Sequence, residues 1–159
     1  MLDEKLKSQI IDKEGYKTEI AKKYTIFLVQ YPEIFSDLIS GSIFDFGLYD
    51  SIETYYKESP VDMFNVLRKG NGIEIKPGGA VDSDLQLALS VSAVKKLIQT
   101  KSKVEYAELC GSFYNDPDDE KGWIDFVLYK RSQTIINMGY GKFAQTAGIL
   151  EDYDDIDSI

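Results

Sequence analysis

Apolar side chains recur every three or four residues through the first 40 positions, which is the spacing of one face of an α-helix. The positions that follow this period are Leu6, Ile10, Ile20, Tyr24, Leu28 and Tyr31. Gly15 interrupts the pattern, and Pro32 ends it because the residue before a proline disfavours helical geometry. Pro32 also suits the first turn of a second, short helix that stops at Gly41. The first part of the chain therefore predicts helices.

The middle of the chain changes its pattern several times. Residues 42–58 are rich in aromatic side chains without a clear period, so they fit either a core or an exposed binding face. Ser59 followed by Pro60 resembles a helix start and predicts a helix to Lys69. Residues 72–76 alternate as a short strand that Pro77 ends. The capping-box spacing of Ser83 and Gln86 predicts a helix over 84–100, with a strand over 85–91 as the alternative.

Strand-like runs dominate the second half of the chain. We expect strands over 104–114, 123–130 and 134–140, and a turn over 115–122, where Asn, Pro and Gly stand among acidic residues. Helices first and strands afterwards predict an α+β fold, in which N-terminal helices pack on a C-terminal antiparallel β-sheet. We expect a single domain over residues 1–150 and a mobile acidic tail over 151–159.

The composition indicates the cellular compartment of the protein and restricts the reactions that its side chains can catalyse. The 159 residues carry a formal net charge of −9, no histidine and one cysteine, Cys110. A lone cysteine cannot form an internal disulfide, and no secretory signal or membrane-spanning apolar run is visible, so we expect a cytoplasmic protein. The excess of acids argues against nucleic acid, whose phosphates require Lys and Arg. Without histidine, proton transfer and metal binding lack their most common side chain.

The acidic residues are clustered, and the clusters predict the binding surface. One cluster surrounds the aromatic segment 42–58, and another fills the predicted turn 115–122. Patches of one charge raise the rate of association with an oppositely charged partner, although they also serve solubility alone. We expect no cofactor, no metal and no catalytic residue. The candidate partner-binding residues are Asp50, Glu53, Tyr55, Tyr56, Asp116, Asp118, Asp119 and Glu120.

One local pattern suggests an enzyme. Gly111 and Ser112 follow an apolar run, and Asp125 stands in the next one, after Trp123. This order resembles part of the small nucleotidyltransferase signature, in which a Gly-Ser turn grips the nucleotide phosphate and an Asp-x-Asp pair on the next strand binds Mg²⁺. The resemblance covers about 45 residues. Trp123 occupies the position of the first Asp, and one carboxylate does not hold a two-metal site.

These observations favour a binding protein over an enzyme. The leading hypothesis is a small acidic immunity protein or antitoxin that neutralises a basic toxin by occupying its surface. The first alternative is a degenerate or partial nucleotidyltransferase-like enzyme centred on the Gly-Ser turn and Asp125. The second alternative is a phage or structural assembly component. The sequence does not indicate an oligomeric state or name the partner.

Overall fold

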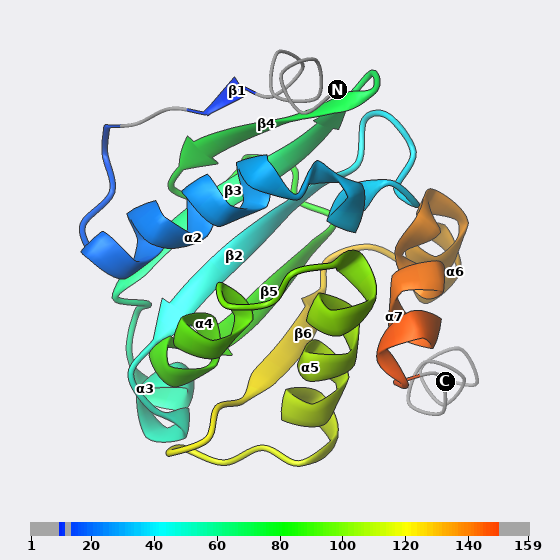
Figure 1. The fold of residues 1–159 in the computed structure, drawn as a ribbon. Coiled ribbons are helices and arrows are strands. Elements are labelled where there is room, and N and C mark those ends of the chain that lie inside the picture. Colours follow the sequence, from blue (N-terminus) through cyan, green and yellow to red (C-terminus); the bar gives the residue numbers. More distant parts are fainter. Residues whose placement is uncertain (1–9, 12–13, 150–159) are drawn as a thin grey trace.

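The computed structural model describes residues 10–11 and 14–149, and it contains helices on both sides of one β-sheet (Figure 1). The predicted acidic tail, residues 151–159, lies outside the described residues. The strands are β1 (Ile10–Ile11), β2 (Ile43–Tyr49), β3 (Asp62–Lys69), β4 (Gly72–Pro77), β5 (Leu85–Ser90) and β6 (Ile124–Leu128). The helices are α2 (Glu19–Gln30), α3 (Ile52–Lys57), α4 (Val91–Leu97), α5 (Lys103–Asn115), α6 (Ser132–Ile135) and α7 (Gly141–Ala147). A 3₁₀ turn, η1 (Pro32–Phe35), follows α2, and a π-helical turn, η2 (Ile136–Tyr140), joins α6 to α7.

The sheet is mixed and its strand order is β1-β4-β3-β2-β5-β6. Strands β2, β3 and β4 form an antiparallel meander, β5 runs parallel to β2, and β6 returns antiparallel to β5. The parallel β2–β5 pair requires a crossover, and the chain makes it by building the β3–β4 hairpin on the other side of β2. The central strand β2 therefore has a neighbour on each side and joins the two halves of the sheet.

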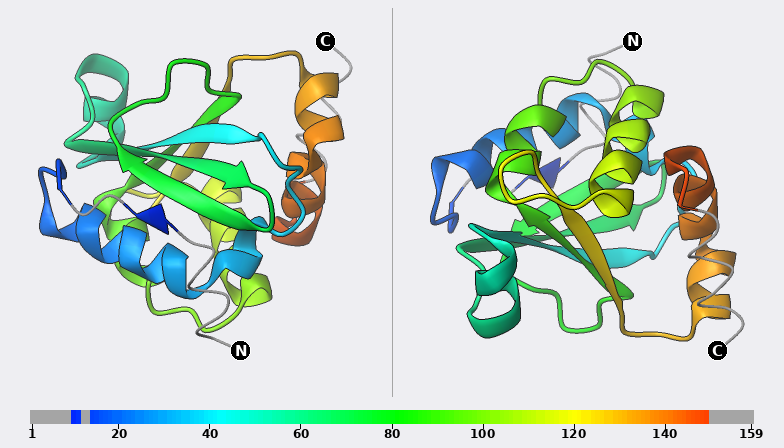
Figure 2. Two further views of the ribbon diagram at one scale, coloured as in Figure 1. Left: turned by 90° about the horizontal axis from the view of Figure 1, so that it is seen from above. Right: turned by 90° about the horizontal axis from the view of Figure 1, so that it is seen from below.

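The two faces of the sheet are covered by different elements and carry different kinds of side chain. Helices α2, α4 and α5 lie on one face, which we call the inner face, whereas α3 and the β4–β5 connection lie on the other, the outer face (Figure 2). Because side chains alternate along a strand, each strand contributes to both faces. The inner-face residues are apolar and include Phe44, Phe46, Leu48, Phe64, Val66, Leu85, Leu87, Leu89, Ile124 and Phe126. The outer-face residues include Asp45, Gly47, Tyr49, Met63, Asn65, Leu67, Gln86, Ala88, Asp125 and Val127.

Aromatic rings form the centre of the core between α2 and the sheet. Tyr24 of α2 lies edge-on to Phe46 and Phe64, at centroid distances of 5.4 and 5.6 Å, and the two Phe rings stack at 4.9 Å. The hydroxyl of Tyr24 shares a hydrogen bond with that of Tyr106 on α5, so the buried polar tips satisfy each other. This contact fixes α2 and α5 on the same face of the sheet.

Several sequence predictions are confirmed. Helix α2 covers the periodic segment after Gly15. The helical pattern before Gly15 is wrong at Ile10, which lies in β1, and the short helix predicted from Pro32 to Gly41 is limited to the 3₁₀ turn η1. Strands β4 and β6 match the runs 72–76 and 123–130, and residues 119–121 form the turn between α5 and β6. The α+β class is also confirmed. The predicted C-terminal antiparallel sheet is wrong, because the sheet is mixed, lies at the centre and takes most of its strands from residues 43–90.

Two predicted helices are strands. Residues 62–69 form β3, in which Phe64 and Val66 face the core, while Met63 and Asn65 face outward. The helix start assigned to Ser59 belongs to Ser51, whose hydroxyl accepts from Thr54 N–H in a capping box. Residues 85–90 form β5, which confirms the strand given as the alternative. The helix predicted over 84–100 is wrong in its first part and is limited to α4.

Two predicted strands are helical. Residues 103–115 form α5, whose buried side chains include Tyr106, Cys110 and Phe113 at spacings of four and three. Residues 134–140 belong to α6 and η2. Cys110 is buried, and burial raises the pKa of its thiol.

Candidate protein-binding surface

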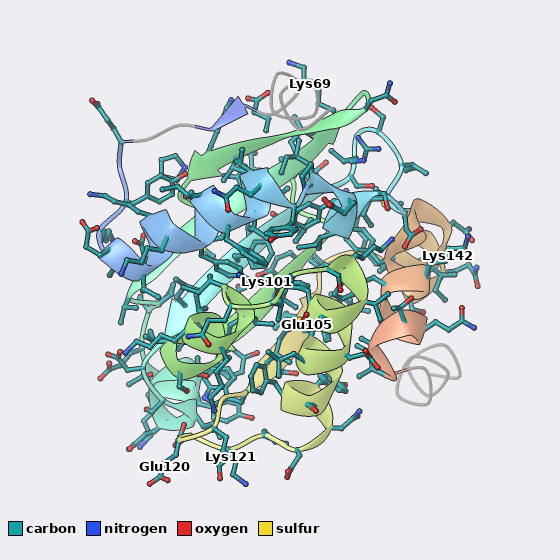
Figure 3. All side chains as sticks on the ribbon, in the orientation of Figure 1. Lys69, Lys101, Glu105, Glu120, Lys121 and Lys142 are labelled. Carbon is teal, nitrogen blue, oxygen red and sulfur yellow. The ribbon has the colours of Figure 1, made fainter. Side chains whose placement is uncertain are left out.

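The two predicted acidic segments meet at one corner of the molecule. The carboxylate of Asp119, in the loop between α5 and β6, accepts a hydrogen bond from the backbone N–H of Ile52 at 2.9 Å. Ile52 is the first residue of α3, so the loop binds the start of this helix, where orphan N–H groups favour a negative charge. Figure 3 shows Glu120 and Lys121 of this loop at the end of the molecule where α3 lies.

Most of the candidate acids around this contact are solvent-exposed. Asp50 immediately precedes the cap of α3, Glu53 lies in its first turn, and Glu120 follows Asp119 in the loop; all four side chains are exposed. We call this group, together with Tyr55 and Tyr56, the acidic corner. Asp116 is exposed as well, but it caps the C-terminal end of α5 at the start of the loop.

The acids of the loop divide into two roles. Asp118 accepts from the backbone N–H groups of Glu120 and Lys121 at 2.9 and 2.8 Å, which closes the turn. These hydrogen bonds, led by that of Lys121, lower the pKa of Asp118. Asp119 holds α3 and also accepts from the indole N–H of Trp123 at 3.2 Å. Two of the four loop acids therefore shape the loop, whereas no hydrogen bond or ion pair to the side chain of Asp116 or Glu120 is seen within the described residues.

An aromatic cluster lies beside these acids on the outer face. Tyr55 of α3 contacts the rings of Tyr49, Tyr56 and Trp123 at centroid distances of 5.0, 5.1 and 5.2 Å. Trp123 is 2% exposed, whereas Tyr56 is 76% exposed. The cluster therefore extends from a buried indole to a solvent-exposed phenol. The ring of Trp123 packs with Tyr49, Ala88, Ile52 and Tyr55.

A hydrogen bond fixes the orientation of Tyr55. Its hydroxyl donates to the carboxylate of Asp125 on β6 at 2.9 Å. Burial, followed by this hydrogen bond and the neighbouring negative charge, raises the pKa of Tyr55 above its ordinary value. The phenol therefore stays protonated and remains a donor at neutral pH. Asp125 thus positions the ring that joins the exposed and buried parts of the cluster.

Lysines reduce the net negative charge of the corner. Lys57 pairs with Glu53 at 3.0 Å, and both side chains are largely exposed. The ammonium group of Lys96 donates to the carbonyl oxygen of Lys121. The unpaired negative charge of the corner is therefore carried chiefly by Asp50 and Glu120, for which no ion pair is seen within the described residues.

The outer face continues from the corner along β5 and β6. Tyr129 donates to Gln86 at 2.8 Å, and Gln86 donates to the hydroxyl of Tyr49 at 3.1 Å, which links the edge of the sheet to the aromatic cluster. Val127 and Tyr129 are exposed. Sequence analysis did not name Val127 and Tyr129 as candidates. The apolar residues Ile124, Phe126 and Leu128 occupy every second position, which indicates that Asp125, Val127 and Tyr129 share the opposite face.

The nucleotidyltransferase pattern lacks its structural context. Gly111 and Ser112 lie inside α5, so they form no strand-to-helix turn, and Gly111 packs against Ala147. Asp125 is on a strand, but its carboxylate accepts a hydrogen bond from Tyr55.

Over residues 10–11 and 14–149, no three potential ligands among Cys, Asp and Glu are grouped as a metal site. The helices in the same part of the chain are all too short or too polar to cross a membrane.

Comparisons with protein-family models, with curated proteins and with solved structures give no match to this chain, so the argument for its function depends on its own residues.

Proposed function

We propose that this chain is a cytoplasmic binding protein of the immunity-protein or antitoxin kind, which neutralises a basic toxin by occupying its surface. The single observation that carries the proposal is the acidic corner, where exposed acids from two distant segments meet at α3, the helix that carries the exposed Tyr56. The chain acts in this proposal by binding and not by catalysis.

The chemistry of the corner suits a partner rich in Lys and Arg. Tyrosine and tryptophan are enriched among the residues that dominate binding energy, because they bury a large area with few rotatable bonds. A guanidinium or ammonium group placed over the exposed ring of Tyr56 would gain a cation–π contact. The exposed carboxylates of Asp50 and Glu120 in the same acidic corner would pair with further cations and raise the association rate.

The rest of the interface would extend along the outer face. A standard interface buries about 800 Å² on each partner, which is more than one short helix and one loop provide. The exposed side chains of Val127, Tyr129 and Val81 lie beyond the corner, on β6 and on the connections that follow β6 and β4. We therefore place the toxin across the corner and the β5–β6 part of the outer face.

The test is capture of a partner by the immobilised chain from its host, followed by binding kinetics with the purified partner. We compare the wild type with the double variant Asp50→Lys/Glu120→Lys. The control is Glu19→Lys/Glu108→Lys, which changes the net charge equally at exposed positions of α2 and α5 on the helical side. We expect a basic partner whose association rate falls on the order of tenfold or more in the corner variant and at high salt, but changes little in the control at the same salt.

Two results would contradict the proposal. The first is a partner whose association is indifferent to salt and to the corner variant. The second is an equal loss in the corner and control variants, because it would mean that net charge matters and the location of the acids does not.

A further inference from the structure

A pocket of about 100 Å³ lies between the inner face of the sheet and the helices α5, α6 and α7. Protein interiors are close-packed, and most hold few voids larger than a water molecule. An engineered apolar cavity of about 150 Å³ in another protein binds benzene. The pocket has about two thirds of that volume, which limits an occupant to the size of one small ring or a short alkyl chain.

Apolar side chains form most of its wall. Phe44, Leu87 and Phe126 contribute from the sheet, and Ile135 and Phe143 from the C-terminal helices. A buried water requires two to four polar partners, and these side chains offer none. Water is consequently a poor occupant of this space, which favours an apolar ligand.

Two tyrosines of the wall, Tyr106 and Tyr140, direct their hydroxyl groups to other partners. The hydroxyl of Tyr140 donates to the buried carboxylate of Asp84 at 2.8 Å, and that of Tyr106 shares its hydrogen bond with Tyr24. Asp37, which also lines the pocket, is ion-paired with Lys103 at 2.6 Å. These groups leave no uncompensated charge to attract an ionic ligand.

Two glycines set how closely the C-terminal helices approach the rest of the protein. A side chain at Gly111 of α5 would overlap the backbone of Ala147 at the end of α7. A side chain at Gly139 of η2, where φ is +102°, would overlap the backbone of Asp37. Close backbone contacts therefore fix the position of α7 near both of its ends.

We propose that this pocket binds a small uncharged apolar molecule, of the size of one aromatic ring or a short alkyl chain. The ligand contacts the inner face of the sheet and the C-terminal helices. This site is separate from the acidic corner, which lies beside α3 on the outer face, and it does not depend on the proposed toxin.

Titration with toluene, followed by methyl NMR and thermal unfolding, tests the proposal. Ala144 lines the pocket, so Ala144→Phe places a ring inside it. Gln145→Phe adds the same ring at the next, exposed position of α7 and is the control. We expect saturable shifts of the Leu87, Ile135 and Ala144 methyl signals and a rise in melting temperature with toluene in the wild type and in Gln145→Phe, and neither effect in Ala144→Phe.

Ala144→Leu makes the test decisive if the larger variant fails to fold, because it fills the pocket partly and should weaken toluene binding without abolishing it. Absence of saturable shifts in the wild type near the solubility limit of toluene would overturn the proposal. Equal binding by the wild type and a folded Ala144 variant would overturn it as well, because the ligand would then occupy another site.

Discussion

Replacing Asp119 by alanine should destabilise the fold, although the residue is exposed and belongs to an acidic loop. The substitution removes the acceptor for Ile52 N–H at 2.9 Å and for the Trp123 indole N–H at 3.2 Å. A hydrogen bond to a charged group contributes about 1.5–3 kcal/mol, and solvent exposure reduces this value for the Ile52 contact. We therefore expect Asp119→Ala to lower the free energy of unfolding by about 2 kcal/mol.

Asp116 provides the matched control within the same loop. Its backbone N–H donates to Ser112 and is unaffected by a change of side chain. Asp116→Ala should therefore change the free energy of unfolding by under about 0.5 kcal/mol, as is usual at exposed positions. Asp119→Asn keeps an acceptor oxygen without the charge and should fall between the two.

Urea unfolding followed by far-UV circular dichroism measures these differences, and the fluorescence of Trp123, the single tryptophan, provides a second probe. A double-mutant cycle of Asp119→Ala with Trp123→Phe isolates the indole contact and should give a coupling free energy of about 1 kcal/mol. The reasoning is refuted if Asp119→Ala and Asp116→Ala have equal effects, or if the cycle gives no coupling.

Two further predictions concern stability. Trp123→Ala should lower the free energy of unfolding by ~3–5 kcal/mol, because it removes a buried indole from its contacts with Tyr49 and Tyr55; circular dichroism measures this loss, and a value below about 1 kcal/mol would contradict the packing. The hydrogen bond from Lys76 lowers the pKa of Glu74, so its contribution to stability is present above the ordinary glutamate pKa of about 4.3 and is lost as the pH falls through the lower pKa of the folded state. Glu74→Gln should flatten this acid limb in unfolding measured from pH 6 to pH 2, and an unchanged limb would show that other carboxylates produce it.

Local pattern predicted the elements whose period was unambiguous. Helix α2 repeats its apolar face over three turns, and Ile124, Phe126 and Leu128 place an apolar residue at every second position of β6, so both could be found from the sequence. The capping box proposed at Ser83 was a false match, because Ser83 is buried before β5 and Ser90 caps the next helix by accepting from Ala93 N–H. Short polar motifs of this kind occur by chance wherever Ser, Thr and Gln are common.

The acidic corner depends on a contact that no local pattern contains. The sequence shows that Asp119 and Glu53 carry charge, but Ile52 and Asp119 are 67 positions apart and meet because β5 and β6 bring the loop to α3. Sequence analysis consequently could not separate Asp118 and Asp119, which shape the loop, from the acids whose side chains face solvent. It also treated Trp123 and Tyr55 separately, although their contact joins the two segments.

The hydrogen bonds of Asp118 and Asp119 should reduce the entropy that the loop loses on binding a partner. A charged loop that becomes ordered only in a complex loses part of its interaction energy to the entropy of ordering. Asp118 closes the loop and Asp119 attaches it to α3, so the backbone at Glu120 is held in place before any partner arrives. Asp50 directly precedes Ser51, which caps the same helix. In the proposed complex, reversing Asp50 and Glu120 should therefore slow association, whereas Asp119→Ala should weaken binding by loosening the loop. The two kinds of variant are distinguished by unfolding measurements, because only Asp119→Ala should also lower stability.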